Sequence, residues 1–267
     1  LRIGLNGFGR IGRNVLRAAL SDDRIEIVGI NDVMDNDEMR YLFAHDSVHG
    51  SVPDVSVESG NLVVGSESIP LYDIGDPAEL PWDELVISAP PKGEKDVLQI
   101  VYGVNHDEYS GEDVVSNASC TTNSISPVAK VLNDTFGIES GLLTTVHAYT
   151  GSQNLVDGPN SKPRRRRAAA ENIVPTSTGA AQATTEVLPE LEGKLDGMAM
   201  RVPVPNGSIT ELVVDLEGNP DVDEINAAFK EAADGELAGV LGYTDDELVS
   251  RDIIGLPFSS YVDLPST

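Results

Sequence analysis

The chain has very little cysteine, few histidines and no long hydrophobic run. Its 267 residues include a single cysteine, Cys120, which excludes an internal disulfide framework and is typical of a reducing compartment. No stretch approaches the roughly 18 consecutive apolar residues that a membrane-spanning helix needs. The opening LRIGLNGFGR also lacks the charged leader and apolar run of a secretion signal. We therefore expect a cytoplasmic protein without a membrane-spanning helix.

Positive charge is scarce as well. Lysine and arginine total 18 against 44 aspartate and glutamate, so the formal net charge is -26. This balance argues against a nucleic-acid-binding or membrane-binding protein, and the four consecutive arginines at 164–167 are too few to reverse it. An ordinary acidic enzyme is one interpretation. We favour adaptation to high salt, because the charge far exceeds the magnitude of about 2–8 usual for a small domain and dissolved salt screens the self-repulsion.

The length and the apolar fraction of 40% together allow two domains with substantial cores. Residues 2–6 and 25–30 have the composition of buried strands, and 10–20 carries apolar residues at helical spacing. Strand, helix and strand within about 30 residues predict a parallel pair with a right-handed crossover. Residues 41–81 are expected to form short hairpin strands. These hairpin strands are expected at 55–58, 61–64 and 69–71, and further strands of this part at 85–89, 101–104 and 114–116.

The pattern changes in the second part of the chain. An amphipathic helix is predicted over 124–136, with Pro127 early in it and Gly137 as its stop. A capping-box arrangement, in which Asp221 precedes Glu224 by three residues, opens a later helix. Long strands are expected at 142–149, 197–204 and 208–216, with helices at 179–191 and 221–234. Such strands with helices gathered to one side predict an α+β domain with a mainly antiparallel sheet.

A glycine-rich motif follows the first strand. Gly7, Gly9 and Gly12 form G-x-G-x-x-G directly before the first predicted helix. The first glycine permits a tight turn, the second lets the backbone approach a pyrophosphate, and the third lets helix and strand pack closely. The N–H groups near Arg10 and Ile11 would then face the phosphates at the positive end of the helix. The motif in this context predicts a dinucleotide-binding site.

Asp32 ends the second predicted strand, twenty residues after Gly12. A carboxylate at this place can accept hydrogen bonds from the adenosine ribose and would repel a 2′-phosphate, which favours NAD over NADP. The alternative is a glycine-rich turn that binds no ligand. We predict an α/β protein with a doubly wound, Rossmann-type NAD-binding domain over 1–119 and an α+β catalytic domain over 120–267.

Cys120 lies between a predicted strand and an amphipathic helix, so it is expected at a helix N-terminus. The helix dipole and free N–H groups there favour the thiolate, the form that acts as a nucleophile. The alternative is a buried, inert thiol, which the polar neighbours in SCTTN do not favour. A thiolate needs a partner, and of the four histidines His147 stands at the end of a strand among threonines. Spacing alone leaves this Cys–His pair open.

Several segments together resemble the phosphorylating glyceraldehyde-3-phosphate dehydrogenases. The pairing of ASCTTN with HAYT is highly specific, and the resemblance covers nearly the whole chain. The matching segments are LNGFGRIGR, IND, ISAPPK, VYGVNHDEY, SNASCTTN, TVHAYTGSQ, RRAAAENIVPTSTGAA, LPELEGKLDGMAMRVPVPNGS and the closing LPST.

The resemblance implies a mechanism. Cys120 would add to the aldehyde carbon of D-glyceraldehyde 3-phosphate to give a thiohemiacetal, and His147 would act as the base on its hydroxyl group. NAD would accept the hydride, and the resulting thioester would pass its acyl group to inorganic phosphate, giving 1,3-bisphosphoglycerate. No metal site is expected. The family forms homotetramers of cytosolic subunits, which we carry over as an expectation.

The resemblance also implies where the substrate phosphate and the attacking phosphate bind. Besides the nucleophile, the matching positions are Ser119, Thr121, Thr150, Thr178, Gly179 and Arg201. Each has a plainer interpretation: Ser119, Thr121 and Thr178 could cap helices, and an isolated arginine is usually a surface residue. We interpret 164–167 as interface ion pairs, with Arg167 near the attacking phosphate.

The sequence departs from the family pattern in three ways. About 30 residues, one strand-plus-helix unit, are expected to be missing between Glu84 and Leu85, and the chain stops at Thr267 before the final elements of the family. Gly158-Pro159 replaces the Leu-Pro of NAD-type members, which leaves NADP open. An incomplete sequence is one explanation and a degenerate, non-catalytic cofactor-binding paralogue is another. A related aldehyde dehydrogenase of the same superfamily is the alternative enzyme.

Overall fold

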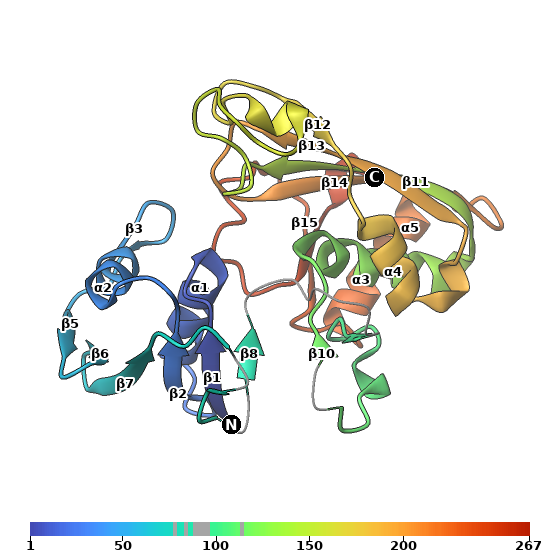
Figure 1. The fold of residues 1–267 in the computed structure, drawn as a ribbon. Coiled ribbons are helices and arrows are strands. Elements are labelled where there is room, and N and C mark those ends of the chain that lie inside the picture. The colour runs from blue at the N-terminus through green and yellow to red at the C-terminus, as the bar shows by residue number, and fades with distance from the viewer. Residues whose placement is uncertain (77–78, 83–84, 88–96, 113–114) are drawn as a thin grey trace. The chain divides into compact units, whose positions relative to one another are not determined.

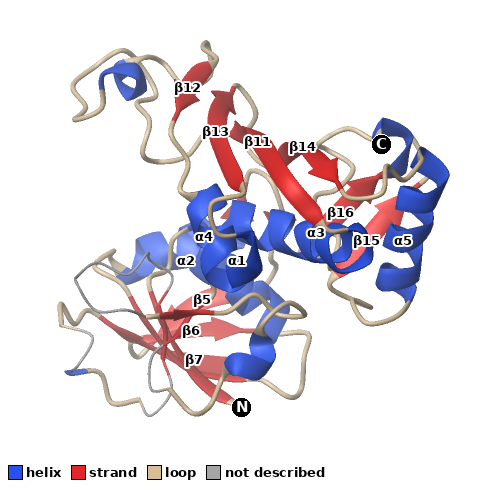
Figure 2. Cartoon of the chain, turned by 90° about the vertical axis from the view of Figure 1, so that its right-hand side faces the viewer, coloured by secondary structure: helices blue, strands red, loops and turns tan. Residues whose placement is uncertain are grey.

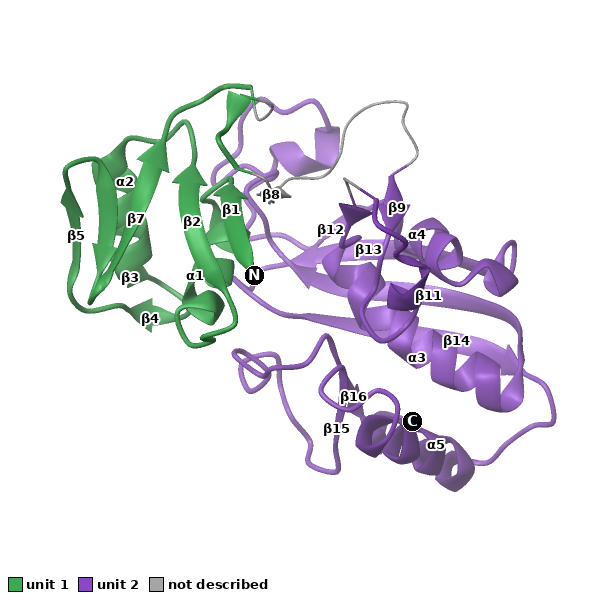
Figure 3. Cartoon of the chain, turned by 90° about the horizontal axis from the view of Figure 1, so that it is seen from below, with its two compact units in different colours: residues 1–94 green, residues 95–267 purple. Residues whose placement is uncertain are grey.

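The computed structural model describes residues 1–76, 79–82, 85–87, 97–112 and 115–267. The chain divides into two compact units, Leu1–Glu94 and Lys95–Thr267 (Figure 3). Within the described residues, none of the helices combines the length and the apolar character that crossing a bilayer requires. The expected gap between residues 84 and 85 cannot be traced, because 83–84 and 88–96 lie outside the described residues.

In its described residues, the first unit contains two α-helices and eight strands. The helices are α1 (Arg10–Ala19) and α2 (Asn36–Ala44). The strands are β1 (Arg2–Asn6), β2 (Glu26–Asn31), β3 (His45–Asp46), β4 (Gly50–Ser51), β5 (Val55–Glu58), β6 (Asn61–Val64), β7 (Glu67–Tyr72) and β8 (Leu85–Ile87).

Six of these strands form one sheet in the order β5-β6-β7-β2-β1-β8 (Figure 1). Strand β1 pairs in parallel with β2 and with β8, and β2 pairs in parallel with β7. The predicted parallel unit around the glycine motif is therefore confirmed. Its core includes fully buried apolar side chains from the two central strands, both helices and the glycine loop, namely Leu5, Phe8, Leu16, Ile30, Met39 and Phe43.

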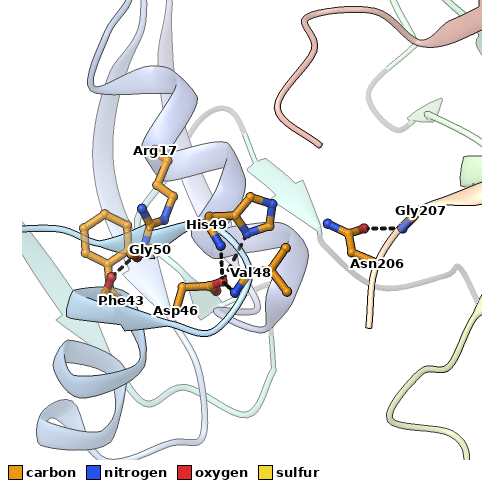
Figure 4. Close-up of polar contacts among 8 residues, drawn as sticks. All are labelled: Arg17, Phe43, Asp46, Val48, His49, Gly50, Asn206 and Gly207. Carbon is orange, nitrogen blue, oxygen red and sulfur yellow. Dashed lines mark hydrogen bonds and ion pairs between the residues drawn. The ribbon is translucent and has the colours of Figure 1, made fainter. Parts of the chain in front are cut away.

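Helix α2 replaces part of the expected hairpin region, so that expectation was wrong for 41–44. The carboxylate of Asp35 accepts the Asp37 N–H at 2.8 Å and caps the helix, and Met39 and Phe43 are buried at helical spacing. Arg17 Nη2 donates to the carbonyl oxygens of Phe43 and Gly50, each at 3.0 Å, and so ties α1 to the end of α2 and to β4 (Figure 4).

The second unit contains three α-helices and eight described strands. The helices are α3 (Cys120–Phe136), α4 (Ala180–Val187) and α5 (Val222–Asp234), with short 3-10 turns at His106–Glu108, Pro163–Arg166, Pro189–Leu191 and Leu264–Ser266. The strands are β9 (Leu98–Gln99), β10 (Val115–Ser116), β11 (Ile138–Ala148), β12 (Val174–Thr176), β13 (Leu195–Val202), β14 (Ser208–Leu216), β15 (Leu241–Thr244) and β16 (Ser260–Asp263).

The main sheet of the second unit has the order β12-β13-β11-β14. Strand β11 is antiparallel to β14 and parallel to β13, and β12 is antiparallel to β13. The mainly antiparallel sheet is thus confirmed. Helix α5 lies beside the small β15–β16 sheet (Figure 2), and α3 and α5 share an apolar core around Leu132, Ile138, Phe229 and Leu237.

Residues 97–112 and 115–119 belong to the second unit, whereas the predicted NAD-binding domain extended to 119. Strand β9 pairs with β10, and the Gln99 side chain donates to the Glu186 carboxylate on α4. The expected strand at 101–104 is wrong: the N–H groups of Val104 and Asn105 both bond to the Val101 carbonyl, which makes a turn. The division of labour between 1–119 and 120–267 stays a prediction.

Helix α3 begins earlier than predicted, at Cys120 rather than at 124. The Ser119 hydroxyl accepts the Thr122 N–H at 3.0 Å and caps the helix, and Gly137 ends it with a positive φ of 78°. Pro127 is consequently a buried residue of the helix interior and not part of its first turn. Its missing N–H cannot bond to the carbonyl four residues earlier, so tertiary packing must hold the helix together there.

The capping box of α5 is formed as predicted. Asp221 accepts the Glu224 N–H and Glu224 accepts the Asp221 N–H, both at 2.9 Å. We expect Asp221→Ala to lower the free energy of unfolding by about 0.5–2 kcal/mol, measured by urea denaturation at fixed salt. Asp223→Ala, which changes a first-turn carboxylate outside the box, is the matched control and should cost less. Equal losses of unfolding free energy in the two variants would show that a negative charge near the start of the helix, and not the cap, stabilises it.

Candidate functional site

Cys120 is the first residue of α3, and its side chain is exposed. A tight turn precedes it, in which Ala118 has a positive φ of 52°, a conformation that non-glycine residues rarely adopt. The Asn123 side chain donates to the carbonyls of Asn117 at 2.7 Å and Ser119 at 3.0 Å, which fixes this turn. Such strain is tolerated where the surroundings over-determine the backbone, and here it presents the sulfur atom at the helix N-terminus.

The Cys120 sulfur contacts the imidazole of His147. Cys120 Sγ and His147 Nε2 are 3.3 Å apart. The hydrogen bond to His147 lowers the pKa of the Cys120 thiol below its ordinary value; partial burial opposes this shift, and hydrogen bonds from Thr121 support it. Of the histidines, His147 is the one that the sequence singled out, and the structure brings these two side chains together.

His147 is held from its other side by Arg201. The two residues are register partners in the parallel pair of β11 and β13, which places them beside each other at the ends of neighbouring strands. Arg201 Nη1 lies 2.6 Å from His147 Nδ1 and 3.0 Å from the Ala148 carbonyl oxygen. His147 Nδ1 also lies 2.7 Å from the Ala148 carbonyl oxygen, which can only accept, so a proton on Nδ1 bonds there and Nε2 faces the sulfur.

Arg165 is the second cation of this region, and sequence reasoning missed it. Arg165 donates to Ser152 Oγ at 3.0 Å and to Thr176 Oγ1 at 3.3 Å. Burial lowers the pKa of the Arg201 guanidinium, and the positive charge of Arg165 lowers it further. Among the described residues, neither Arg165 nor Arg201 forms an ion pair with a carboxylate. Two such cations together make a site for an anion.

Arg167 is paired with a carboxylate in this structure, and the expectation that it lies near the attacking phosphate stays a prediction. Its Nε donates to the Asp157 carboxylate at 2.8 Å, and Asp157 also accepts the Ala168 N–H at 2.9 Å. The four adjacent arginines have the same charge and the same side chain. The 3-10 turn at Pro163–Arg166 determines which of these side chains points toward Arg201. The sequence pattern alone does not predict which arginine this is.

The hydroxyl groups expected to bind phosphate have local partners in this structure. Ser119 caps α3, and the Thr178 hydroxyl accepts the Ala180 N–H at 3.1 Å at the start of α4, where Gly179 is the capping residue. Thr150 Oγ1 lies 2.9 Å from Ser152 Oγ, so Ser152 links it to Arg165. In the part of the chain that the structure describes, no hydrogen bond joins Thr178 to the Cys120, His147 and Arg201 side chains.

The glycine motif in the first unit is shaped for a dinucleotide. Gly7 has a φ of 101° and donates its N–H to the Asn31 carbonyl at 2.8 Å. Gly9 caps α1, and a Cβ atom placed there would meet nothing within 4 Å, so a ligand can approach this backbone. Arg10 and Ile11, the first two residues of α1, follow it, and Gly12 is buried.

Asp32 lies at the end of β2, beside this loop. Its two carboxylate oxygens accept the Phe8 N–H at 2.6 Å and the Met34 N–H at 3.0 Å. The carboxylate is thereby fixed in position next to the glycine turn, where a ribose would lie in a dinucleotide-binding fold. The open backbone at Gly9, the helix N-terminus and this fixed carboxylate together fit NAD.

Comparison with protein families matches both parts of the chain. The family model of the glyceraldehyde 3-phosphate dehydrogenase NAD binding domain matches residues 1–89, and the model of the C-terminal domain of the same enzyme matches residues 119–267. The second match includes the Cys120, His147 and Arg201 positions, and the first includes the glycine motif and Asp32.

Individual relatives agree with the family match. The chain is 61% identical to glyceraldehyde-3-phosphate dehydrogenase of Haloarcula vallismortis, over 298 residues that cover 100% of this chain and 89% of the relative. It is 48% identical to glyceraldehyde-3-phosphate dehydrogenase 1 of Bacillus subtilis (strain 168) and to the enzyme of Geobacillus stearothermophilus, each over 299 residues with the same coverage. These alignments are longer than the 267 residues of the chain, so the relatives carry residues inside the matched region that this sequence lacks. The chain belongs to the glyceraldehyde-3-phosphate dehydrogenase family.

Proposed function

We propose that the chain oxidises D-glyceraldehyde 3-phosphate to 1,3-bisphosphoglycerate with NAD and inorganic phosphate, a reaction of glycolysis and gluconeogenesis. The observation that carries the proposal is the 3.3 Å contact between Cys120 Sγ and His147 Nε2 at the N-terminus of α3, in a member of this family. A thiolate at that place is the nucleophile that an aldehyde requires.

Cys120 and His147 divide the chemistry between them. The Cys120 thiol gives its proton to Nε2 of His147, and the resulting thiolate adds to the aldehyde carbon while the imidazolium passes that proton to the carbonyl oxygen. The products are a neutral thiohemiacetal and a neutral imidazole. His147 then takes that proton back as the carbon loses its hydride, and a thioester results. The free N–H groups at the start of α3 can stabilise negative charge on the substrate oxygen, both here and when phosphate attacks the thioester.

The first unit holds the cofactor. When bound, NAD supplies the acceptor for the hydride. Gly9 and the N–H groups of Arg10 and Ile11 at the start of α1 would hold its pyrophosphate, and Asp32 would accept hydrogen bonds from its ribose. The Asp32 carboxylate supports a preference for NAD. Because Gly158-Pro159 stands where NAD-type members have Leu-Pro, the assay should compare NAD with NADP.

The second unit holds the two phosphate groups. We propose that Arg201 and Arg165 bind the phosphate of the substrate, with Thr150 as a hydroxyl donor, because their charges converge and lack carboxylate partners among the described residues. The N-terminal N–H groups of α3 and α4, with the hydroxyls of Ser119, Thr121 and Thr178 and the backbone of Gly179, would bind the attacking phosphate. The Ser119 and Thr178 side chains each occupy one backbone N–H group. The other N–H groups in the first turn of each helix stay available to bind phosphate.

The adjacent arginines give a matched test of this assignment. We expect Arg165→Ala to raise the KM for glyceraldehyde 3-phosphate at least tenfold, because a hydrogen bond to a charged group contributes about 1.5–3 kcal/mol. Arg167→Ala, which loses only its exposed pair with Asp157, should leave the KM within about twofold. Steady-state kinetics at saturating NAD and phosphate measure both. A larger effect of Arg167→Ala would reverse the assignment.

We further propose that the protein acts as a homotetramer in the cytoplasm. One face of the main sheet of the second unit carries exposed apolar side chains from three neighbouring strands: Leu142 is 63% exposed, Ile209 62%, Val213 62% and Met198 41%. Leu142 and Val213 are register partners, so these side chains share a face. A face of this kind supports burial against a second copy. Sedimentation velocity in molar salt distinguishes the tetramer from a monomer.

High salt should be the working condition of the enzyme. With a net charge of -26, the folded chain repels itself, and dissolved ions screen that repulsion over distances of about 3 Å at 1 M salt. We expect kcat/KM and the thermal midpoint both to rise from low salt to molar KCl. Measurement over a KCl series checks this, with choline chloride as a second salt. Maximal activity at low salt would show an ordinary acidic enzyme.

The alternative enzyme is a related aldehyde dehydrogenase of the same superfamily, and the alternative protein is a non-catalytic cofactor-binding paralogue. An NADH absorbance assay in molar KCl separates them, run with several aldehydes, with NAD or NADP, and with or without phosphate. The proposal predicts NADH formation that requires both glyceraldehyde 3-phosphate and inorganic phosphate. Turnover that is independent of phosphate would indicate the related enzyme, and no turnover with any aldehyde would indicate the paralogue.

A further inference from the structure

The sequence contains two Asn-Gly pairs, Asn6–Gly7 and Asn206–Gly207. Asparagine followed by glycine is especially prone to spontaneous deamidation, because glycine has no Cβ to shield its amide nitrogen from the preceding side chain. Whether a folded protein reacts at such a pair depends on what holds the nitrogen and the side-chain amide. The two pairs differ in this respect.

In the Asn6–Gly7 pair, hydrogen bonds hold both reactive groups, the Asn6 side-chain amide and the Gly7 nitrogen. The Asn6 side-chain oxygen accepts a hydrogen bond from Asn31 Nδ2 at 2.7 Å, and the Gly7 N–H donates to the Asn31 carbonyl at 2.8 Å. Asn31 itself is only 3% exposed. The nitrogen that would have to attack and the amide that would be attacked are therefore both bound to Asn31 of β2.

Asn206–Gly207 has the opposite arrangement. It lies in the turn between β13 and β14, where the Gly207 N–H donates to the side-chain oxygen of its own neighbour, Asn206, at 2.8 Å (Figure 4). The nitrogen thus lies 2.8 Å from the oxygen atom of the carboxamide whose carbon it would attack, and both residues are partly accessible to solvent. We propose that Asn206–Gly207 is a covalent modification site at which this chain deamidates spontaneously.

The reaction needs only hydroxide and water. Hydroxide removes the Gly207 amide proton, and the nitrogen forms a bond to Asn206 Cγ while the bond from Cγ to the side-chain nitrogen breaks and ammonia leaves. Water then opens the cyclic succinimide at one of its two carbonyl carbons. Opening at one carbon gives aspartate at 206; opening at the other gives an isoaspartyl link, which carries one extra carbon in the main chain. No oxidation or reduction takes place.

The site is coupled to the strand that carries His147. The Gly207 carbonyl accepts the Ala148 N–H at 3.0 Å, and the next residue, Tyr149, donates its N–H to the Val204 carbonyl at 3.1 Å. An extra main-chain carbon and a new negative charge in this turn move both acceptors relative to the end of β11. We therefore expect deamidation to lower dehydrogenase activity by displacing His147, a consequence that rests on the proposed function.

Asp196–Gly197 provides an internal comparison. The Gly197 N–H donates to the Asp196 carboxylate at 2.7 Å, the same contact between neighbours. A carboxylate is a much poorer electrophile than an amide, however, and Gly197 lies inside β13, where an added Cβ would come within 2.5 Å of the Leu143 side chain. The backbone there has no room to form a ring. In alkaline buffer we expect this pair to stay unchanged while Asn206 reacts.

The test is ageing of the full chain in mildly alkaline buffer with molar KCl, followed by peptide mapping with mass spectrometry. The peptide that contains Asn206 should convert to two isomeric products with a carboxyl group in place of the amide, with the isoaspartyl form in excess and the rate rising with pH. The peptides of Asn6 and Asp196 should stay intact. An Asn206 peptide that is unchanged in the folded chain but converts in the urea-unfolded chain would overturn the proposal, as would earlier conversion at Asn6.

Asn206→Gln is the matched variant, because it keeps the amide but requires a six-membered ring that closes far more slowly. It should show no conversion at 206 and should keep its activity on ageing, whereas the unchanged chain loses activity in proportion to its isoaspartyl content. Asn206→Ser gives the same comparison if the glutamine variant does not fold. Equal loss of activity in all chains would overturn the coupling to His147. The mass measurement needs no activity, so the modification site stands or falls independently of the proposed function.

Discussion

Cys120→Ser should reduce the kcat for glyceraldehyde 3-phosphate oxidation by on the order of 10⁴-fold or more. A serine hydroxyl stays protonated at neutral pH, and the contact with His147 that lowers the pKa of the Cys120 thiol cannot generate an alkoxide. The substitution changes one exposed atom at the helix start, so the fold should be retained. Steady-state NADH formation measures the loss, with thermal denaturation as the check on folding.

Two controls make this result specific. Ser124→Ala alters a partly buried side chain of the same helix four residues later. It should keep activity within about twofold, since changes away from special features usually cost little. Iodoacetamide should label the unchanged chain at Cys120 alone and abolish turnover in step with labelling. A serine variant that keeps most of its turnover would contradict covalent catalysis by this residue.

His147→Asn should lower kcat by about 10²–10⁴-fold, the contribution typical of a positioned general acid and base. The substitution removes the imidazole 3.3 Å from the sulfur and the ring nitrogen that Arg201 contacts. It leaves Cys120 itself at the N-terminus of α3, so residual activity from the thiol is expected. Steady-state kinetics give kcat, and the KM for NAD should not change because the glycine motif is untouched.

The same variant predicts a shift in pH dependence. In the unchanged chain the hydrogen bond to His147 lowers the pKa of Cys120, so the thiolate is present, and alkylation by iodoacetamide is fast, at a lower pH than for an ordinary thiol. Without His147 the pKa rises and the alkylation curve moves to higher pH. His49→Asn, which changes a histidine paired with Asp46 in the other unit, should leave the curve in place. An unshifted curve in His147→Asn would show that the helix N-terminus alone ionises Cys120.

Local sequence indicated each member of the central pair of the site, whereas spacing left their pairing open and the family resemblance implied it. The polar SCTTN segment before an amphipathic run predicts a capped helix start, and Ser119 does cap α3. His147 stands at the end of a long alternating strand, and the end of a strand is where side chains reach a site. The glycine motif was predictable for the same reason, since the turn after β1 requires a positive φ at Gly7.

Elements that depend on tertiary contacts could not be predicted. The turn at 101–104 has the β-branched composition of a strand, but the Asn105 side chain accepts the Val101 N–H at 2.9 Å and draws the backbone around. The interior position of Pro127 follows from a helix that starts at the cap of Ser119 rather than at the first apolar residue. Only the packing of the 163–166 turn distinguishes the position of the Arg165 side chain from the positions of the three neighbouring arginine side chains.

The most direct measurement is the mass of the enzyme after reaction with glyceraldehyde 3-phosphate and NAD in the absence of inorganic phosphate, quenched in acid and mapped by peptide. The account predicts a phosphoglyceroyl group on the peptide that contains Cys120, absent from the Cys120→Ser chain and lost within the turnover time when phosphate is added. NADH formed in the first turnover should equal the amount of this thioester. NADH formation without any adduct, or an adduct on another residue, would contradict the account.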